Sequence, residues 1–175
     1  MADEPGGSRR RPLRQLDARA AHLVAANLLA RRPWTRADLA RRLIRRGAPG
    51  EVADAVVAEL TARGYLDDAA YARQWVESRS ARGYGAARLR AELRSRGVNA
   101  ALVDAAIGGL TPDTVLDRAF ALARRRWPVI ARGRPERVAA RLSEYLLRRG
   151  YAPGVVVRVV RELTRVAATA DQVVT

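Results

Sequence analysis

The feature that most constrains this chain is a pattern of leucine, arginine and glycine that occurs three times. Gly47, Gly97 and Gly150 each follow an arginine directly. Leucines lie four and eight residues before each of these glycines, and another leucine lies thirteen residues after each. Leucines four apart occur in any amphipathic helix, but here three residue types keep the same offsets. A period of about 50 residues held over three copies is typical of a repeat array.

The pattern predicts an all-α fold of three tandem three-helix repeats, stacked into an elongated, curved array. Of the 175 residues 49% are hydrophobic but only 5% are aromatic. We therefore expect a thin core in each repeat, completed by its neighbours. The predicted boundaries are 1–16 for a disordered basic N-terminal arm, 17–64, 65–110 and 111–165 for the three repeats, and 166–175 for a frayed tail.

Helix start and stop signals support this division. Asp17, Thr35, Asn99 and Thr111 are suitable N-caps, whose side-chain oxygens accept backbone N–H groups that the first turn leaves unpaired. Trp127-Pro128 is predicted to end the first helix of the third repeat, because proline cannot continue a helical hydrogen-bond ladder.

The segment 63–93 shows the repeat most clearly. Gly64 is expected just past a helix end, and Asp67 or Asp68 at the next N-cap. Tyr71, Trp75 and Val76 then fall on one helical face. The segment Gly83-Tyr84-Gly85 is expected to be a turn, because it lacks the glycine and lysine spacing of a phosphate-binding loop.

Charge indicates the class of partner. All 33 basic residues are arginines, against 18 acidic residues, which gives a net charge of +15. A genome rich in G and C would explain arginine in place of lysine, but not the sign of the charge. This excess favours a polyanion or an acidic protein surface as the partner. The third repeat has the strongest bias, with 13 arginines and 5 acidic residues.

The sequence offers little for catalysis. There is no cysteine, and His22 is the only histidine, so a histidine-based metal cluster or triad has no second member. Asp67 and Asp68 are adjacent and do not share a helical face, which favours capping over paired carboxylates. We expect no enzyme activity, catalytic residue, metal or cofactor. The absence of cysteine fits a cytoplasmic location, and no apolar run reaches membrane-spanning length, so we expect no contact with membranes. We also expect a monomer.

Arginines off the leucine stripes are the candidate partner-binding residues, although a solvated face is their default interpretation. An arginine before a repeat glycine can hold phosphate or offset the dipole of a helix C-terminus, and the sequence does not choose between these roles. Trp34, Tyr84 and Trp127 can stack on nucleobases, but the hydrophobic-staple spacing of two of them, Trp34 and Tyr84, favours core packing. The candidates are Arg88, Arg90, Arg94, Arg96, Arg137, Arg141, Arg148 and Arg149.

The order of these features resembles the RecX family of bacterial recombinase regulators. The resemblance covers residues 17–165, and the third repeat departs most from the family pattern because its link before Pro135 is long. The family-motif residues, expected to be structural, are Gly64, Tyr65, Leu66, Asp67, Asp68, Tyr71, Gly83, Gly85, Leu89, Leu93 and Gly97.

The resemblance implies a protein of homologous recombination, DNA repair and the SOS response. Its implied partner is the RecA–DNA filament, including DNA phosphates within it. Its implied action is to inhibit the ATPase, the growth and the strand exchange of that filament. The alternative from another class is a sequence-tolerant nucleic-acid-binding protein that acts without a recombinase.

Overall fold

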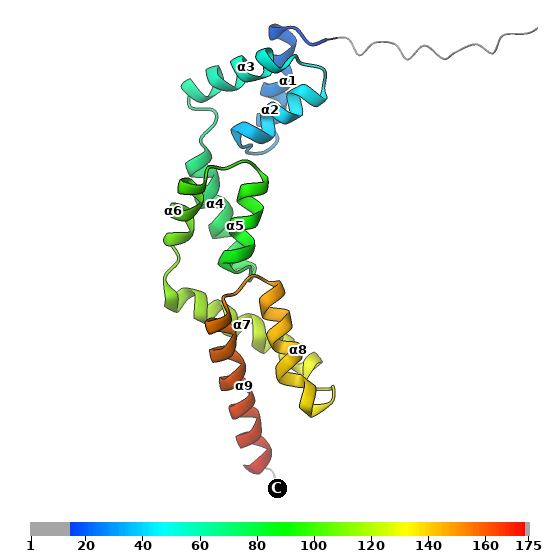
Figure 1. Cartoon of the computed structure of the whole chain (residues 1–175), viewed down its shortest axis with the longest axis vertical. Coiled ribbons are helices and arrows are strands. Elements are labelled where there is room, and N and C mark those ends of the chain that lie inside the picture. Colours follow the sequence, from blue (N-terminus) through cyan, green and yellow to red (C-terminus); the bar gives the residue numbers. More distant parts are fainter. Residues whose placement is uncertain (1–14, 174–175) are drawn as a thin grey trace, which may run out of the picture. The chain divides into compact units, whose positions relative to one another are not determined.

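A computed structural model describes residues 15–173, apart from the side chains of 168 and 170–173. The described residues contain nine helices and no strand, which confirms the predicted all-α class. Figure 1 shows their order. The helices are α1 (Ala18–Leu29), α2 (Arg36–Arg45), α3 (Gly50–Ala62), α4 (Asp68–Ala81), α5 (Ala86–Ser95), α6 (Ala100–Gly108), α7 (Pro112–Ile130), α8 (Pro135–Arg148) and α9 (Pro153–Val173).

The chain forms two compact units, unit 1 (residues 1–66) and unit 2 (residues 67–175). Buried side chains form three clusters, one in α1–α3, one in α4–α6 and one in α7–α9. The second and third clusters both belong to unit 2. The threefold sequence repeat and the stacking of its copies into an array stay predictions.

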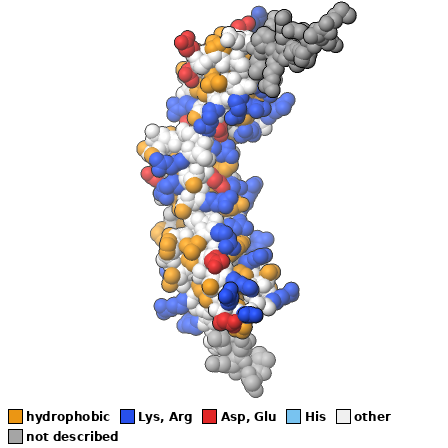
Figure 2. Space-filling model, turned by 45° about the vertical axis from the view of Figure 1, so that its right-hand side comes forward, with side chains coloured by type: hydrophobic (Ala, Val, Ile, Leu, Met, Phe, Trp, Pro, Cys, Tyr) orange, Lys and Arg blue, Asp and Glu red, His pale blue; other side chains and the backbone are white. Residues whose placement is uncertain are grey.

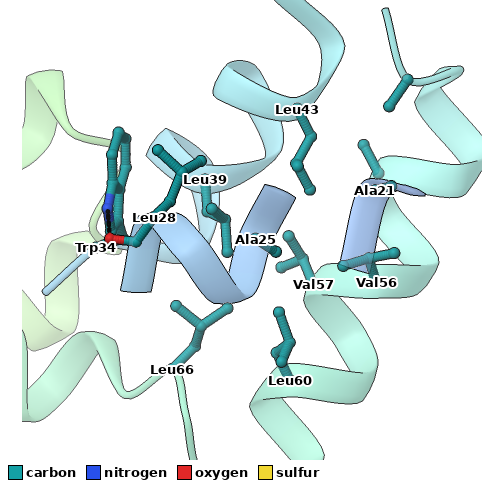
Figure 3. Close-up of a cluster of buried hydrophobic side chains, with 12 residues drawn as sticks. Ala21, Ala25, Leu28, Trp34, Leu39, Leu43, Val56, Val57, Leu60 and Leu66 are labelled. Carbon is teal, nitrogen blue, oxygen red and sulfur yellow. Dashed lines mark hydrogen bonds between the residues drawn. The ribbon is translucent and has the colours of Figure 1, made fainter. Parts of the chain in front are cut away.

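The core of unit 1 is built on the leucine stripe of α2. Leu39 and Leu43 are fully buried and pack with α1 and α3 residues such as Ala25 and Val56 (Figure 3). Trp34 lies at one end of this cluster, and its Nε1 donates to the carbonyl oxygen of Leu28 at 3.1 Å. Burial of each leucine contributes roughly 1.5–3 kcal/mol, so this stripe holds the unit together.

The predicted N-caps are present. The Asp17 carboxylate accepts from the N–H of Ala20, and the Thr35 hydroxyl from that of Asp38. Asp67 accepts from two N–H groups of α4, which confirms the capping interpretation for this residue. Asn99 and Thr111 likewise cap α6 and α7.

The family-motif residues have different environments. Leu89 and Leu93 of α5 are fully buried, and Leu66, Asp68 and Tyr71 are also buried. Tyr65, in contrast, is 65% exposed and lies outside the core. The glycines of this motif that end helices, Gly64, Gly83 and Gly97, have positive φ, as the helix-end interpretation requires.

One predicted helix end differs from the structure. Helix α7 continues through Pro128 to Ile130, although Trp127-Pro128 was expected to end it. Proline there removes one N–H, but the carbonyl of Trp127 still accepts from Ala131 at 2.8 Å. Ile130 is buried in the α7–α9 cluster, and its burial favours the extra turn.

The two chain ends are described only in part. Helix α9 continues to Val173, through most of the segment 166–175 that was predicted to fray. Most of the predicted N-terminal arm lies outside the described residues. Its last residue, Leu16, packs against the unit 1 core, and its N–H donates to the carbonyl of Gly47 at 2.9 Å. The predicted boundary between the arm and the first repeat stays a prediction.

Candidate partner-binding surface

A single carboxylate, Glu92 of α5, organises the polar surface between α4 and α5. It accepts from Trp75 Nε1 at 3.1 Å, from Arg79 Nε at 3.0 Å and NH2 at 2.6 Å, and from Arg88 Nε at 3.0 Å. The Arg79 and Glu92 side chains are only 22% and 19% exposed. Partial burial and the two-nitrogen contact make this ion pair stronger than an ordinary surface pair.

These contacts change the protonation equilibria of both partners. Burial alone would raise the pKa of Glu92, but hydrogen bonds from Arg79, Arg88 and Trp75 outweigh it and lower that pKa. The hydrogen bond to Glu92 raises the pKa of Arg79. The pair is therefore ionised at neutral pH.

Two aromatic rings contact the arginines of this surface. The Tyr84 ring has the guanidinium carbons of Arg79, Arg88 and Arg149 at 4.2, 4.8 and 5.0 Å from its centroid. The Trp75 ring has that of Arg96 at 4.2 Å. Such cation–π contacts contribute about 0.5–1 kcal/mol each at exposed sites and hold long side chains in fixed directions.

We call this group the Arg–aromatic cluster, and it includes Trp75, Arg79, Tyr84, Arg88, Glu92, Arg96 and Arg149. Its four arginines outweigh its one carboxylate, so the cluster presents net positive charge. Figure 2 shows a face on which blue arginine side chains cover much of the surface.

A backbone contact between the turn before α5 and the turn after α8, which we call the joint, brings Arg149 to Tyr84. The N–H groups of Gly85 and Ala87, at the start of α5, donate to the carbonyls of Arg149 and Gly150 at 2.8 and 3.1 Å. Helix α5 has no side-chain N-cap, and these carbonyls at the end of α8 take that role. The partial charges of the two helix ends are also complementary.

Glycine is required on both sides of this joint. A Cβ on Gly85 would lie 2.3 Å from the carbonyl oxygen of Gly150, and a Cβ on Gly150 would lie 2.5 Å from the backbone nitrogen of Arg88. Gly150 also has a φ of 89°. Only glycine permits this approach without a backbone shift.

The structure places only some of the predicted arginines together. Arg88, Arg96 and Arg149 belong to the Arg–aromatic cluster. Arg90 instead contacts Asp104 of α6 at 3.2 Å. Arg94 is exposed and has no carboxylate partner among the described residues.

The candidate arginines on α8 share no carboxylate partner among the described residues. Arg148 pairs with Glu144 at 3.5 Å, in a pair that is more than two-thirds exposed on both sides. Arg137 and Arg141, nearer the start of α8, are exposed. Partner binding by all eight candidates stays a prediction.

Sequence reasoning missed Arg79, Trp75 and Glu92 as parts of this surface. The Arg88 and Glu92 spacing of four residues was an available signal for one of the contacts. No local signal indicated the pairing of Arg79 with Glu92, because thirteen residues and a turn separate them.

Two domain descriptions of one family match the chain. The description "RecX, second three-helix domain" matches residues 67–107, and "RecX, first three-helix domain" matches residues 21–60. A regulatory protein RecX from Thermobifida fusca is 44% identical over 144 residues, which are 81% of this chain and 77% of the relative. The chain belongs to the RecX family.

Further RecX proteins are similar to this chain over most of its length. The Mycobacterium avium protein is 38% identical over 89% of this chain and 90% of its own. The crystal structure of RecX from Lactobacillus salivarius has a TM-score of 0.75 and 16% identity, covering 84% of this chain and 96% of that one. A second RecX crystal structure has a TM-score of 0.74 and 21% identity, covering 81% and 70%. These two structures support the RecX fold.

Most of the Arg–aromatic cluster lies in the segment that matches the second RecX three-helix domain. Residues 67–107 contain all of its members except Arg149. Arg149 reaches the cluster only through the joint with the α8 end. No described helix of this RecX chain is long and apolar enough to cross a membrane.

Proposed function

We propose that this protein regulates a RecA recombinase by binding the RecA–DNA filament and inhibiting its ATPase, its growth and its strand exchange. Its membership of the RecX family, whose relatives are named regulatory proteins, supports a regulatory role. The chemistry of the proposed contact lies in this chain's own surface.

The Arg–aromatic cluster is the observation that carries the proposal. Arginines held by rings and by one carboxylate lose less side-chain freedom on binding than free arginines do. Guanidinium groups pair with carboxylates of a protein or with phosphates of DNA in two-nitrogen geometry. A filament of protein on DNA presents both kinds of acceptor. The proposed contact surface therefore includes the Arg–aromatic cluster and the two other exposed arginines of α5, Arg90 and Arg94, and it can engage either component.

The mode of inhibition follows from preferential binding. A ligand shifts a conformational equilibrium only through different affinities for its states. A basic surface bound to one state of the filament would stabilise that state and slow the conformational cycle that ATP hydrolysis needs. No catalytic group on the regulator takes part in this mode of action.

The decisive experiment is ATP hydrolysis by RecA on single-stranded DNA, with this protein added below the RecA concentration. We expect hydrolysis to fall. A parallel filter-binding measurement on the same DNA without RecA separates regulation from simple competition for DNA. If inhibition disappears whenever DNA is in excess, the protein acts as a nucleic-acid-binding competitor and the proposal is wrong.

A further inference from the structure

Unit 1 contains a basic hollow that the Arg–aromatic cluster does not involve. Its volume is about 510 Å³, and it lies at the α1–α2 connection. Its lining includes Leu28, Arg31, Arg32, Trp34, Arg42 and Arg45. We call it the unit 1 hollow. Its volume falls in the range of small-molecule sites, roughly 300–1,000 Å³.

The described arginines of the unit 1 hollow outnumber its described carboxylates, four to one. Among the described residues, none of Arg31, Arg32, Arg42 and Arg45 makes an ion pair. Asp38 also lines the hollow, but its carboxylate is held by Arg41 at 2.6 Å. Four guanidinium groups therefore line a hollow with only one carboxylate, and an anion with several charges would offset their mutual repulsion.

Trp34 adds a stacking element to this charge. The Arg32 guanidinium carbon lies 3.7 Å from the centroid of the Trp34 ring. The hydrogen bond from Trp34 Nε1 to the Leu28 carbonyl fixes the indole on the core, as Figure 3 shows. The Arg32 guanidinium therefore lies over the indole, and guanidinium planes also stack on nucleobases.

We propose that the unit 1 hollow binds the phosphate chain of a nucleotide, with a base stacked against Arg32. Arg31, Arg42 and Arg45 would pair with phosphate oxygens, for which guanidinium forks are suited. The nucleotide has two possible sources, a free nucleoside triphosphate and a nucleotide within a single strand. This site is independent of the proposed regulatory function, because it needs no recombinase.

The test uses the full-length protein alone at about 0.15 M salt, where the screening length is roughly 8 Å. Fluorescence anisotropy is measured with two probes, a fluorescent ATP analogue and a labelled oligo(dT). The test variant is Arg42→Ala with Arg45→Ala. The matched control is Arg19→Ala with Arg46→Ala, which removes the same charge from unit 1 outside the hollow.

We expect the test variant to lose about tenfold or more in affinity for at least one probe, and the control less than about threefold. The probe that responds identifies the source of the nucleotide. If Arg42→Ala with Arg45→Ala does not fold, Arg31→Ala with Arg45→Ala replaces it, because both of these side chains are exposed. Equal affinities of test and control variants for both probes would overturn the proposal.

A variant that conserves the charge tests the stacking contact separately. Arg32→Lys keeps the positive charge but loses the planar group that stacks. We expect it to weaken binding of the responding probe about threefold or more, and to leave competition by inorganic tripolyphosphate unchanged. If the probe and tripolyphosphate lose affinity equally, the stacking part of the proposal is wrong.

Discussion

The backbone N–H of Gly85 donates a 2.8 Å hydrogen bond to the carbonyl of Arg149, 64 positions further along the chain. This contact joins the start of α5 to the end of α8 and brings the Arg149 guanidinium to the Tyr84 ring. The geometry of the candidate surface therefore depends on a backbone joint as well as on its side chains.

Gly85→Ala tests the joint. Its Cβ would lie 2.3 Å from the Gly150 carbonyl oxygen, so the two turns must separate. We expect a loss of about 1–3 kcal/mol of unfolding free energy, the usual cost of overpacking. Gly108→Ala is the control, since its Cβ meets nothing within 4 Å and alanine favours a helix. Urea unfolding that ranks Gly85→Ala as stable as Gly108→Ala would contradict this role.

Leu93→Ala tests the core of the α4–α6 cluster. Leu93 is fully buried, so its truncation leaves a cavity and should cost about 2–5 kcal/mol of unfolding free energy. Leu147→Ala, at a position 47% exposed, should change stability by about 0.5 kcal/mol or less. Thermal or urea unfolding compares the two variants. Similar losses would mean that the leucine stripe of α5 is not a core element.

Glu92→Gln tests the centre of the Arg–aromatic cluster through pH. The pKa of Glu92 is lowered in the folded protein, so its ionisation stabilises the fold above the unfolded pKa, which is about 4.3. That stability is lost as the pH falls through the folded pKa. We expect Glu92→Gln to be less stable than the parent at pH 7, by about 1–3 kcal/mol.

The difference between Glu92→Gln and the parent should narrow as the solution is acidified below pH 4. Unfolding midpoints measured from pH 7 to pH 3 follow this difference. A constant difference over the whole range would show that the ionised form of Glu92 does not stabilise the fold.

Tyr151→Phe tests a buried hydroxyl. The Tyr151 side chain is 4% exposed, and its hydroxyl has no hydrogen-bond partner among the described residues. Burial raises the pKa of this phenol. Removing an unpaired buried polar group costs no hydrogen bond, so we expect equal stability or a gain of up to about 1 kcal/mol. A clear loss of unfolding free energy would reveal a partner for this hydroxyl.

The sequence predicted the helices well because their signals are local. Asp17, Thr35 and Asp67 act within one turn of the residues they cap, and Leu39 and Leu43 form one stripe. Pro128 misled the prediction because Ile130, two residues beyond it, is buried in a cluster that only tertiary packing creates.

The candidate surface was predictable only in part. Arg88 and Arg149 were candidates because they lie off the leucine stripes, but their meeting at Tyr84 depends on the joint between distant turns. Arg90 was placed with them, yet Asp104 of α6 holds it. The unit 1 hollow lies among residues that the charge comparison ranked below the third repeat.

The most direct test of the regulatory account is inhibition of RecA ATP hydrolysis by Arg90→Glu with Arg94→Glu. Both side chains lie outside the buried leucine stripe, and the Arg90 pair with Asp104 is exposed enough to contribute only about 0–1 kcal/mol. Arg125→Glu with Arg132→Glu is the control, with the same charge change at exposed positions in α7 and just after it.

Unfolding midpoints are first measured to check that all three proteins are folded at the assay temperature. The three proteins are then compared at equal concentrations on single-stranded DNA. We predict that Arg90→Glu with Arg94→Glu inhibits at least tenfold less than the parent, as expected from the loss of about 1.5 kcal/mol or more of charged contacts. The control should inhibit like the parent. Full inhibition by the α5 variant, even when combined with Arg141→Glu and Arg148→Glu, would contradict the proposed role of these arginines.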